Sequence, residues 1–119
     1  MLHHVSIEIP PEEKERALEF WSIVGFEKIV APGQIAQYVD WVEREGTQIH
    51  FIYSEQPTVP VLGHPAVVAP DFEATTAALR EGGFEFEEHD ELWGERRGFA
   101  TAPGGHRVEL MAGPPPRSR

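Results

Sequence analysis

At 119 residues, with 40% apolar residues, three tryptophans and seven phenylalanines, the chain is long enough for one compact domain with a packed interior. Its net charge of −10 argues against nucleic acid, whose phosphates need a surplus of Lys and Arg, and against anionic membrane surfaces. The lack of cysteine excludes disulfides, thiolate metal sites and cysteine nucleophiles. Without a signal peptide or an apolar run of about 18 residues, a soluble cytoplasmic protein is expected.

The first half of the chain reads as a strand, a helix and three further strands. Residues 2–9 alternate between apolar and polar side chains, which predicts a strand, and Pro10-Pro11 ends it. An apolar stripe then predicts a helix that stops at Gly25. Three strands are expected after it, at 26–31, 35–42 and 47–53.

The second half repeats this order. A strand from His64 to Ala69 precedes a helix from Phe72 to Glu81, with Asp71 as the N-terminal cap. Three more strands are expected at 84–89, 96–102 and 106–112. A single βαβββ copy is too small to bury a core, so two must pair. We therefore predict an α+β fold in which two paired βαβββ modules form a curved mixed sheet around a cleft.

The predicted organisation is a single domain over residues 1–112, followed by a short tail. Module one covers 1–53, the segment 54–63 connects the modules, and module two covers 64–112. The tail 113–119 is rich in proline, which is typical of a disordered end.

The repeat places metal-competent side chains at equivalent points. His64 follows His4 by 60 residues at the start of each copy, and Glu109 follows His50 by 59 residues near the end of each copy. Strand alternation turns His4, His50 and Glu109 away from their apolar neighbours, so all four side chains would converge if the two sheets face each other. Imidazole and carboxylate groups suit Zn, Ni, Co, Fe or Mn. We therefore predict one divalent metal ion held by His4, His50, His64 and Glu109.

Other polar and aromatic residues carry weaker signals. A lone histidine is more often structural or exposed than a ligand. His3 is expected on the helix side of its strand, His89 at a solvated acidic edge and His106 beside a turn, so none of the three is expected to bind metal. Arg96 and Arg97 are adjacent on one strand, so one of them must face the cleft, where it would either receive a substrate carboxylate or phosphate or remain solvated. Three aromatic side chains could line a pocket but are more often core: Tyr38, Trp41 and Trp93.

Three stretches of the chain resemble the vicinal oxygen chelate superfamily, which includes glyoxalase I, extradiol dioxygenases and the fosfomycin and bleomycin resistance proteins. They are H-H-V-S-I-E-I, F-W-S-I-V-G-F and, most specifically, A-P-G-G-H-R-V-E-L-M. The resemblance covers about residues 2–112. It implies paired βαβββ modules, a cleft for a metal and a small-molecule substrate, and frequently a homodimer whose sites combine ligands from two chains.

Residue by residue, the resemblance supports the same metal ligands. His4, His64 and Glu109 match the His-His-Glu set of extradiol dioxygenases and fosfomycin resistance enzymes. His50 departs from the pattern, because glyoxalase I has Glu there and methylmalonyl-CoA epimerase has Gln. Glu109 matches the ligand that acts as the proton-shuttling base in glyoxalase-like members, so it is the predicted catalytic residue.

Three functions remain open on the sequence. The first is a metal-dependent, glyoxalase-like lyase or isomerase that acts on a small oxygenated substrate by metal chelation and proton transfer. The second is a metal-free small-molecule binding protein like the bleomycin resistance members, whose negative charge would suit a cationic ligand. The third is a non-haem dioxygenase. Metal content distinguishes the second from the others, and oxygen consumption distinguishes the third from the first.

Overall fold

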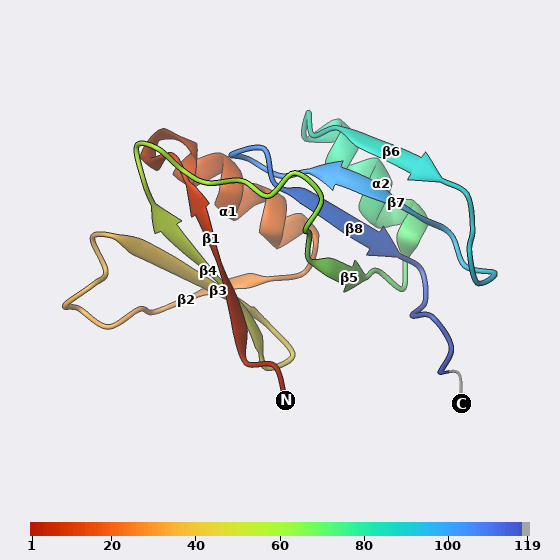
Figure 1. Cartoon of the computed structure of the whole chain (residues 1–119), viewed down its shortest axis with the longest axis horizontal. Helices are drawn as coiled ribbons and strands as arrows, with labels where there is room; N and C mark the ends of the chain where they lie inside the picture. Colours follow the sequence, from red (N-terminus) through yellow and green to blue (C-terminus); the bar gives the residue numbers. More distant parts are fainter. Residues whose placement is uncertain (118–119) are drawn as a thin grey trace. The chain divides into compact units, whose positions relative to one another are not determined.

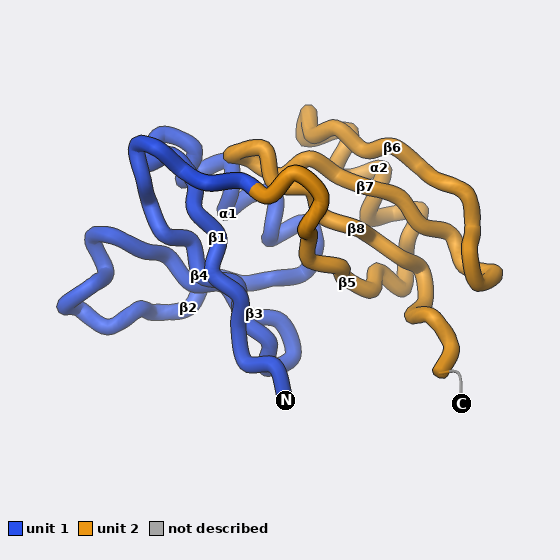
Figure 2. Tube along the Cα trace, in the orientation of Figure 1, with its two compact units in different colours: residues 1–59 blue, residues 60–119 orange. Residues whose placement is uncertain are grey.

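The computed structural model describes residues 1–117, and the chain divides into two compact units, Met1–Val59 and the part from Pro60 onward (Figure 2). The division falls within the segment 54–63 that the sequence assigns to a connector. That residues 1–112 form a single domain stays a prediction. Of the predicted tail, residues 113–117 follow the last strand without a helix or strand of their own, and residues 118–119 lie outside the described residues.

The first unit contains four strands, one α-helix and a short 3-10 helix (Figure 1). Strand β1 pairs in parallel with β4, and β4, β3 and β2 follow one another antiparallel, which gives the order β1-β4-β3-β2. The elements are β1 (His4–Ile9), η1 (Pro11–Glu13), α1 (Lys14–Ile23), β2 (Glu27–Ile29), β3 (Val39–Arg44) and β4 (Thr47–Tyr53).

The second unit repeats this arrangement with the strand order β5-β8-β7-β6, in which β5 and β8 are parallel. Its elements are β5 (Ala66–Val68), α2 (Phe72–Glu81), β6 (Phe86–His89), β7 (Arg97–Thr101) and β8 (Arg107–Met111). The prediction of an α+β fold built from two βαβββ modules is confirmed. Each α-helix has ten residues, and no helix within residues 1–117 is long and apolar enough to cross a membrane.

Most predicted strand boundaries shift by one or two residues, and two of the differences have a clear physical reason. Residues 35–38 were expected in a strand but form tight turns, in which the amide of Ile35 donates to Pro32 and the amide of Tyr38 donates to Ile35. Strand β5 begins at Ala66 rather than at His64, because Pro65 has no amide hydrogen to donate to a ladder. The carbonyl of Pro65 still accepts from the amide of Glu109 at 3.0 Å, so this segment remains attached to β8.

The register of the two sheets confirms the repeat at the level of single residues. In the first unit Ser6 pairs with His50, and in the second Ala66 pairs with Glu109. The neighbouring strand is also equivalent, because Trp41 pairs with His50 where Phe99 pairs with Glu109. His50 and Glu109 therefore occupy the same position in two copies of one unit.

In each unit the helix covers one face of its own sheet. The ring of Trp21 on α1 lies 6.5 Å from that of Phe51 on β4, and Phe72 on α2 lies 5.6 Å from Phe86 on β6. Because side chains alternate along a strand, His50 and Glu109 point to the face opposite the helix. We call this face of each sheet the open face.

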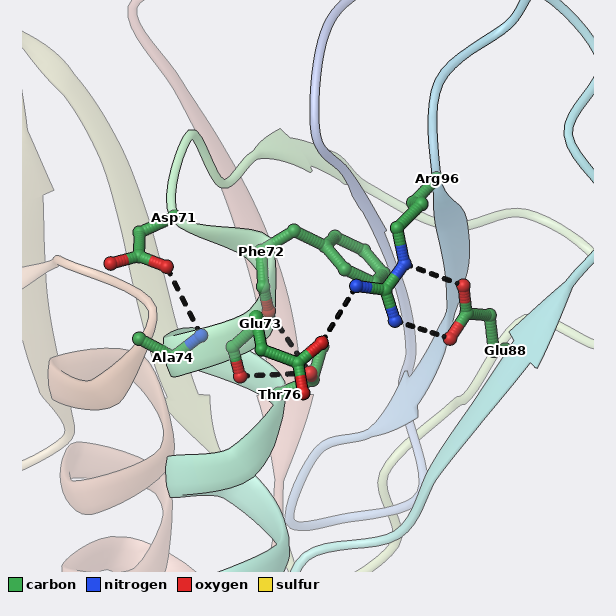
Figure 3. A network of polar contacts seen from close by, with 7 residues as sticks. All are labelled: Asp71, Phe72, Glu73, Ala74, Thr76, Glu88 and Arg96. Carbon is green, nitrogen blue, oxygen red and sulfur yellow. Dashed lines mark hydrogen bonds and ion pairs between the residues drawn. The ribbon is translucent and has the colours of Figure 1, made fainter.

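A polar network holds the start of α2 against β6 (Figure 3). Asp71 caps the helix by accepting from the amide of Ala74 at 3.2 Å, as the sequence predicts. Arg96 binds Glu88 through two contacts of 2.8 and 2.9 Å and Glu73 through one of 2.7 Å. Arg96 therefore lies on the helix side of the sheet, and its contacts are structural.

A buried carboxylate on β3 contacts side chains from α1, β2 and β4 of the first unit. Asp40 on β3 is 6% exposed and accepts the hydroxyl hydrogen of Tyr53 at 2.6 Å. The Nζ atoms of Lys14 and Lys28 each lie 3.4 Å from one of its oxygens. Burial and the hydrogen bond to Asp40 raise the pKa of Tyr53 above its usual range. A buried charge without such partners would be costly, so these contacts allow Asp40 to face the helix.

The raised pKa of Tyr53 predicts how stability changes at alkaline pH. A phenol whose pKa is higher in the folded state stabilises fully below about pH 10 and loses this effect as the pH rises further. We expect a step in phenolate absorbance that coincides with alkaline unfolding. Tyr53→Phe should lack this step and lose about 1–2 kcal/mol of stability at neutral pH, because the hydrogen bond to Asp40 is removed.

Tyr38→Phe is the matched control, because it removes the chain's other phenol from a side chain that is 60% exposed. It should retain the alkaline step. Loss of the step in the Tyr38 variant and not in the Tyr53 variant would contradict the assignment.

Candidate functional site

His50 is enclosed by two rings on the open face of the first unit. Its imidazole lies face to face with that of His4 at 3.9 Å and with the indole of Trp41 at 4.2 Å. Strand β4 runs between β1 and β3, which is why one neighbour comes from each side. The stack leaves His50 only 8% exposed. The first predicted ligand pair, His4 and His50, is therefore brought together by the sheet.

A chain of hydrogen bonds determines which nitrogen of the neutral His50 ring carries the hydrogen. The Gln48 amide nitrogen donates to the Glu43 carboxylate at 3.0 Å, so its amide oxygen is the atom that faces His50. The Nε2–H of His50 donates to this oxygen at 2.7 Å. In the neutral ring the lone pair then lies on Nδ1, which is the nitrogen left to bind a cation.

The environment also favours the neutral form of His50. Burial, followed by the nearby charges of His4 and His3, lowers the pKa of His50. His3 is exposed, and its Nδ1 shares a hydrogen with Nδ1 of His4 at 2.9 Å. A neutral imidazole is the form that binds metal ions, so these contacts suit the predicted role.

The second predicted pair, His64 and Glu109, meets on the open face of the second unit. Nε2 of His64 lies 3.3 Å from Oε1 of Glu109. Nδ1 of His64 lies 2.8 Å from the carbonyl oxygen of Leu62, which can only accept, so this nitrogen carries a hydrogen. In the neutral ring, Nε2 is then a lone pair that faces a carboxylate oxygen. Two acceptors in contact repel each other, unless the ring is protonated or a cation lies between them.

The separation of these two acceptors fits a metal ion. Ligand distances of about 2.1 Å place two donors about 3.0 Å apart at a right angle and about 3.4 Å apart at a tetrahedral angle. The observed 3.3 Å lies within this range, whereas charge-assisted hydrogen bonds are nearer to about 2.8 Å. A backbone carbonyl that holds the second nitrogen of the ring, as Leu62 does, is also typical of metal-binding histidines.

The predicted ligands thus occur as one pair in each unit. Among residues 1–117, no three His, Asp or Glu side chains form a ready metal-binding group. That all four residues hold one ion stays a prediction.

Arg97 is the arginine of the adjacent pair that faces the candidate site. Its Nε donates to Oε2 of Glu109 at 2.9 Å, and both side chains are nearly buried, at 12% and 10% exposed. Its Nη1 donates to the carbonyl of Asp90 at 3.0 Å. The guanidinium also lies 5.8 Å from the ring of Trp93. Arg97 therefore orients the Glu109 carboxylate and balances its charge.

A pocket of about 600 Å³ opens beside this pair in the second unit. Phe99 joins the two, because its ring lines the pocket and lies 4.9 Å from that of His64. His89, expected on a solvated acidic edge, also lines the pocket and lies 5.0 Å from Phe99. Arg107 stacks on the same ring at 4.1 Å. The pocket offers an aromatic surface with both cationic and acidic groups around it.

Several neighbours of the candidate ligands were not expected from the sequence. Gln48 and Phe99 gave no signal, although strand alternation places both on the open face beside a predicted ligand. For Trp41 the sequence left a pocket or the core open, and its ring stacks on His50. Of the remaining candidates, Tyr38 is exposed, and His106 is buried beside the last turn at 4% exposure.

Solved structures of similar fold exist, although no protein-family model and no curated protein matches the sequence. A protein described as of the glyoxalase family from Bacillus anthracis is 22% identical, with a TM-score of 0.82 and 93% of each chain covered. A glyoxalase/dioxygenase from Nostoc punctiforme is 13% identical, with a TM-score of 0.76, covering 96% of this chain and 91% of the other.

A third similar structure contains a metal ion. It is a variant of the fosfomycin resistance protein FosX from Listeria monocytogenes, in complex with Mn(II) and 1S,2S-dihydroxypropylphosphonic acid. It is 19% identical, with a TM-score of 0.75, and the alignment covers 96% of this chain and 90% of the other. Together these likenesses show that the chain has a glyoxalase-like fold, as the sequence resemblance implies.

The two adjacent arginines should differ in their effect on stability. Arg97→Gln leaves the nearly buried Glu109 without its cation, and we expect a loss of about 1–3 kcal/mol. Arg96→Gln is the matched control, and its loss should be smaller because its ion pairs are solvated. Urea unfolding at neutral pH measures both. Equal losses, or a larger loss for Arg96→Gln, would contradict the assignment of Arg97 to Glu109.

Proposed function

We propose that this protein is a divalent-metal-dependent, glyoxalase-like lyase or isomerase that acts on a small oxygenated substrate. His4, His50, His64 and Glu109 would hold the ion. The observation that carries the proposal is the contact between the lone pair of His64 Nε2 and Glu109 Oε1, because a bound cation removes the repulsion between two acceptors 3.3 Å apart.

The hydrogen bonds of the ligands support this donor set. His64 is oriented by the Leu62 carbonyl and His50 by the Gln48 amide, so each ring keeps one nitrogen for a cation. Three neutral imidazoles and one carboxylate would leave a net charge of +1 on a divalent ion. The Mn(II) bound by the similar FosX protein agrees with a hard or borderline divalent ion on this fold.

When bound, the metal ion would polarise a carbonyl oxygen of the substrate. The proton transfer would then belong to Glu109, whose carboxylate would take a proton from the carbon beside that carbonyl and return it to a neighbouring atom. Arg97 would keep the carboxylate in place through Oε2, while Oε1 faces His64. Phe99 and the adjoining pocket would hold the body of the substrate in a partly apolar surface.

A metal-free binding protein is the second candidate, and the Arg97 contact favours it. With Arg97 at 2.9 Å, Glu109 already has a counter-charge and does not require a metal ion for neutrality. The pocket of about 600 Å³ would then be the binding site itself. A dioxygenase is the third candidate, and the glyoxalase/dioxygenase of similar fold is consistent with it.

We also propose a homodimer, the assembly that the resemblance implies. The mass in solution should then be twice the 13.4 kDa of one chain, which light scattering measures directly. A mass of one chain across a range of concentrations would contradict this assembly.

Metal content tests the proposed function. Purified, untagged protein should contain about one equivalent of a transition metal by plasma mass spectrometry. A His50→Ala, Glu109→Ala double variant should contain little, because it removes one ligand from each pair. His89→Ala is the matched control, since it removes an imidazole that is not a predicted ligand, and it should retain the metal.

The outcomes separate the three candidates. A parent protein that is isolated without metal, and that takes up none of Ni, Co, Zn, Mn or Fe(II), contradicts the enzyme and leaves the binding protein. For a protein with metal, turnover of dicarbonyl adducts without oxygen uptake supports the lyase or isomerase. Oxygen consumption with a catechol-like substrate supports the dioxygenase.

A further inference from the structure

The chain has two lysines, and both meet at one carboxylate. Lys14 lies at the start of α1 and Lys28 in the middle of β2. Their Nζ atoms lie 3.4 Å from Oδ2 and from Oδ1 of Asp40, respectively. The fold thus brings every ammonium side chain of an acidic protein to one place.

This lysine cluster has more positive charge than Asp40 needs. Asp40 contributes one negative charge, the two lysines contribute two positive charges, and Tyr53 is neutral and donates its hydroxyl hydrogen. The charge of the exposed Glu15 carboxylate also raises the pKa of Tyr53, but Glu15 does not line the pocket that adjoins the two lysines. If the lysines served only to neutralise Asp40, one would suffice.

The lysine contacts also leave hydrogen-bond donors for another acceptor. Each ammonium group has three N–H donors. At 3.4 Å the ion pairs with Asp40 are longer than charge-assisted hydrogen bonds, which are near about 2.8 Å. The side chains of Lys14 and Lys28 are 43% and 56% exposed, so a ligand can reach both.

A pocket of about 380 Å³ adjoins the lysine cluster within the first unit. Lys14, Lys28 and Asp40 form its polar lining. Its remaining lining is apolar and comes from β2, the loop that follows it and the start of β3: Ile29, Val30, Ala31, Ala36 and Val39. Its volume lies within the range of small-molecule sites, about 300–1,000 Å³.

We propose that this pocket binds a small monoanionic carboxylate that carries a short apolar chain. The carboxylate would lie on Lys14 and Lys28, where one unit of positive charge is in excess. The chain would lie against Ile29 and Val39. None of the three stacked rings, those of His4, Trp41 and His50, lines this pocket. The inference does not rest on the proposed metal site.

Hexanoate is the probe for this proposal. Two matched molecules separate the contribution of its charge from that of its apolar chain. Acetate has the charge without the chain, and hexan-1-ol has the chain without the charge. Titration of uniformly labelled protein, followed by the backbone amide signals of residues 28–40 and the two lysine Nζ signals, measures binding. We expect saturable hexanoate binding with a Kd below about 10 mM. Acetate and hexan-1-ol should bind at least about fivefold more weakly.

Charge-removing variants then locate the anion. Lys14→Gln and Lys28→Gln should each weaken hexanoate binding by about 3–10-fold. Arg16→Gln changes the net charge equally on the same helix, where Arg16 pairs with Glu19, and should bind as the parent does. Absence of saturable binding, equal binding of hexan-1-ol, or the same weakening by Arg16→Gln would each overturn the proposal. The comparison of probes uses the parent protein, so it decides even if a lysine variant does not fold.

Discussion

The parallel pairing of the first and last strand within each unit determines where the candidate ligands lie. In the first unit, β1 runs beside β4, so His4 comes next to His50. In the second unit, β5 runs beside β8, and the chain just before β5 brings His64 to Glu109. A parallel pair requires a long crossover, which α1 or α2 and two further strands supply. The βαβββ unit therefore joins residues that are 45 or 46 positions apart in the sequence.

The two faces of each sheet carry side chains with different roles. Alternation gives one face to the helix and the other to the candidate site, so the side chains of the consecutive residues Asp40 and Trp41 point to opposite faces. On the open face, other side chains hold the candidate ligands through hydrogen bonds. Gln48 and Glu43 orient His50, and Arg97 orients Glu109. Such support is what a site needs in order to keep its geometry.

The sequence predicted the repeat well because it depends on period and offset, which one chain shows directly. Alternating strands, the Asp71 cap and the helix from Phe72 to Glu81 all follow from local patterns, and the structure confirms them. The offset between the copies was enough to predict that His50 and Glu109 are equivalent. Turns such as 35–38 were harder to predict, because their conformation depends on backbone hydrogen bonds and not on the apolar pattern.

The partners of the site residues could not be predicted in the same way. Alternation required that one of Arg96 and Arg97 face the site, but the choice between them depends on the register of β7 against β8. That register pairs Phe99 with Glu109 and brings Arg97 to the carboxylate, while Arg96 turns to Glu73 and Glu88. The meeting of Lys14 and Lys28 at Asp40 likewise depends on the tertiary structure.

The contrast between these two arginines bears on how the candidate site could work. A carboxylate that binds a divalent ion and also moves a proton must be able to change partners without leaving its place. Nε of Arg97 donates to Oε2 of Glu109, while Oε1 faces Nε2 of His64. A change in what Oε1 binds would thus leave the anchor on Oε2 intact. A nearly buried arginine suits this task because its planar guanidinium stays charged and is held by Asp90 and by the rings of Trp93 and Phe99.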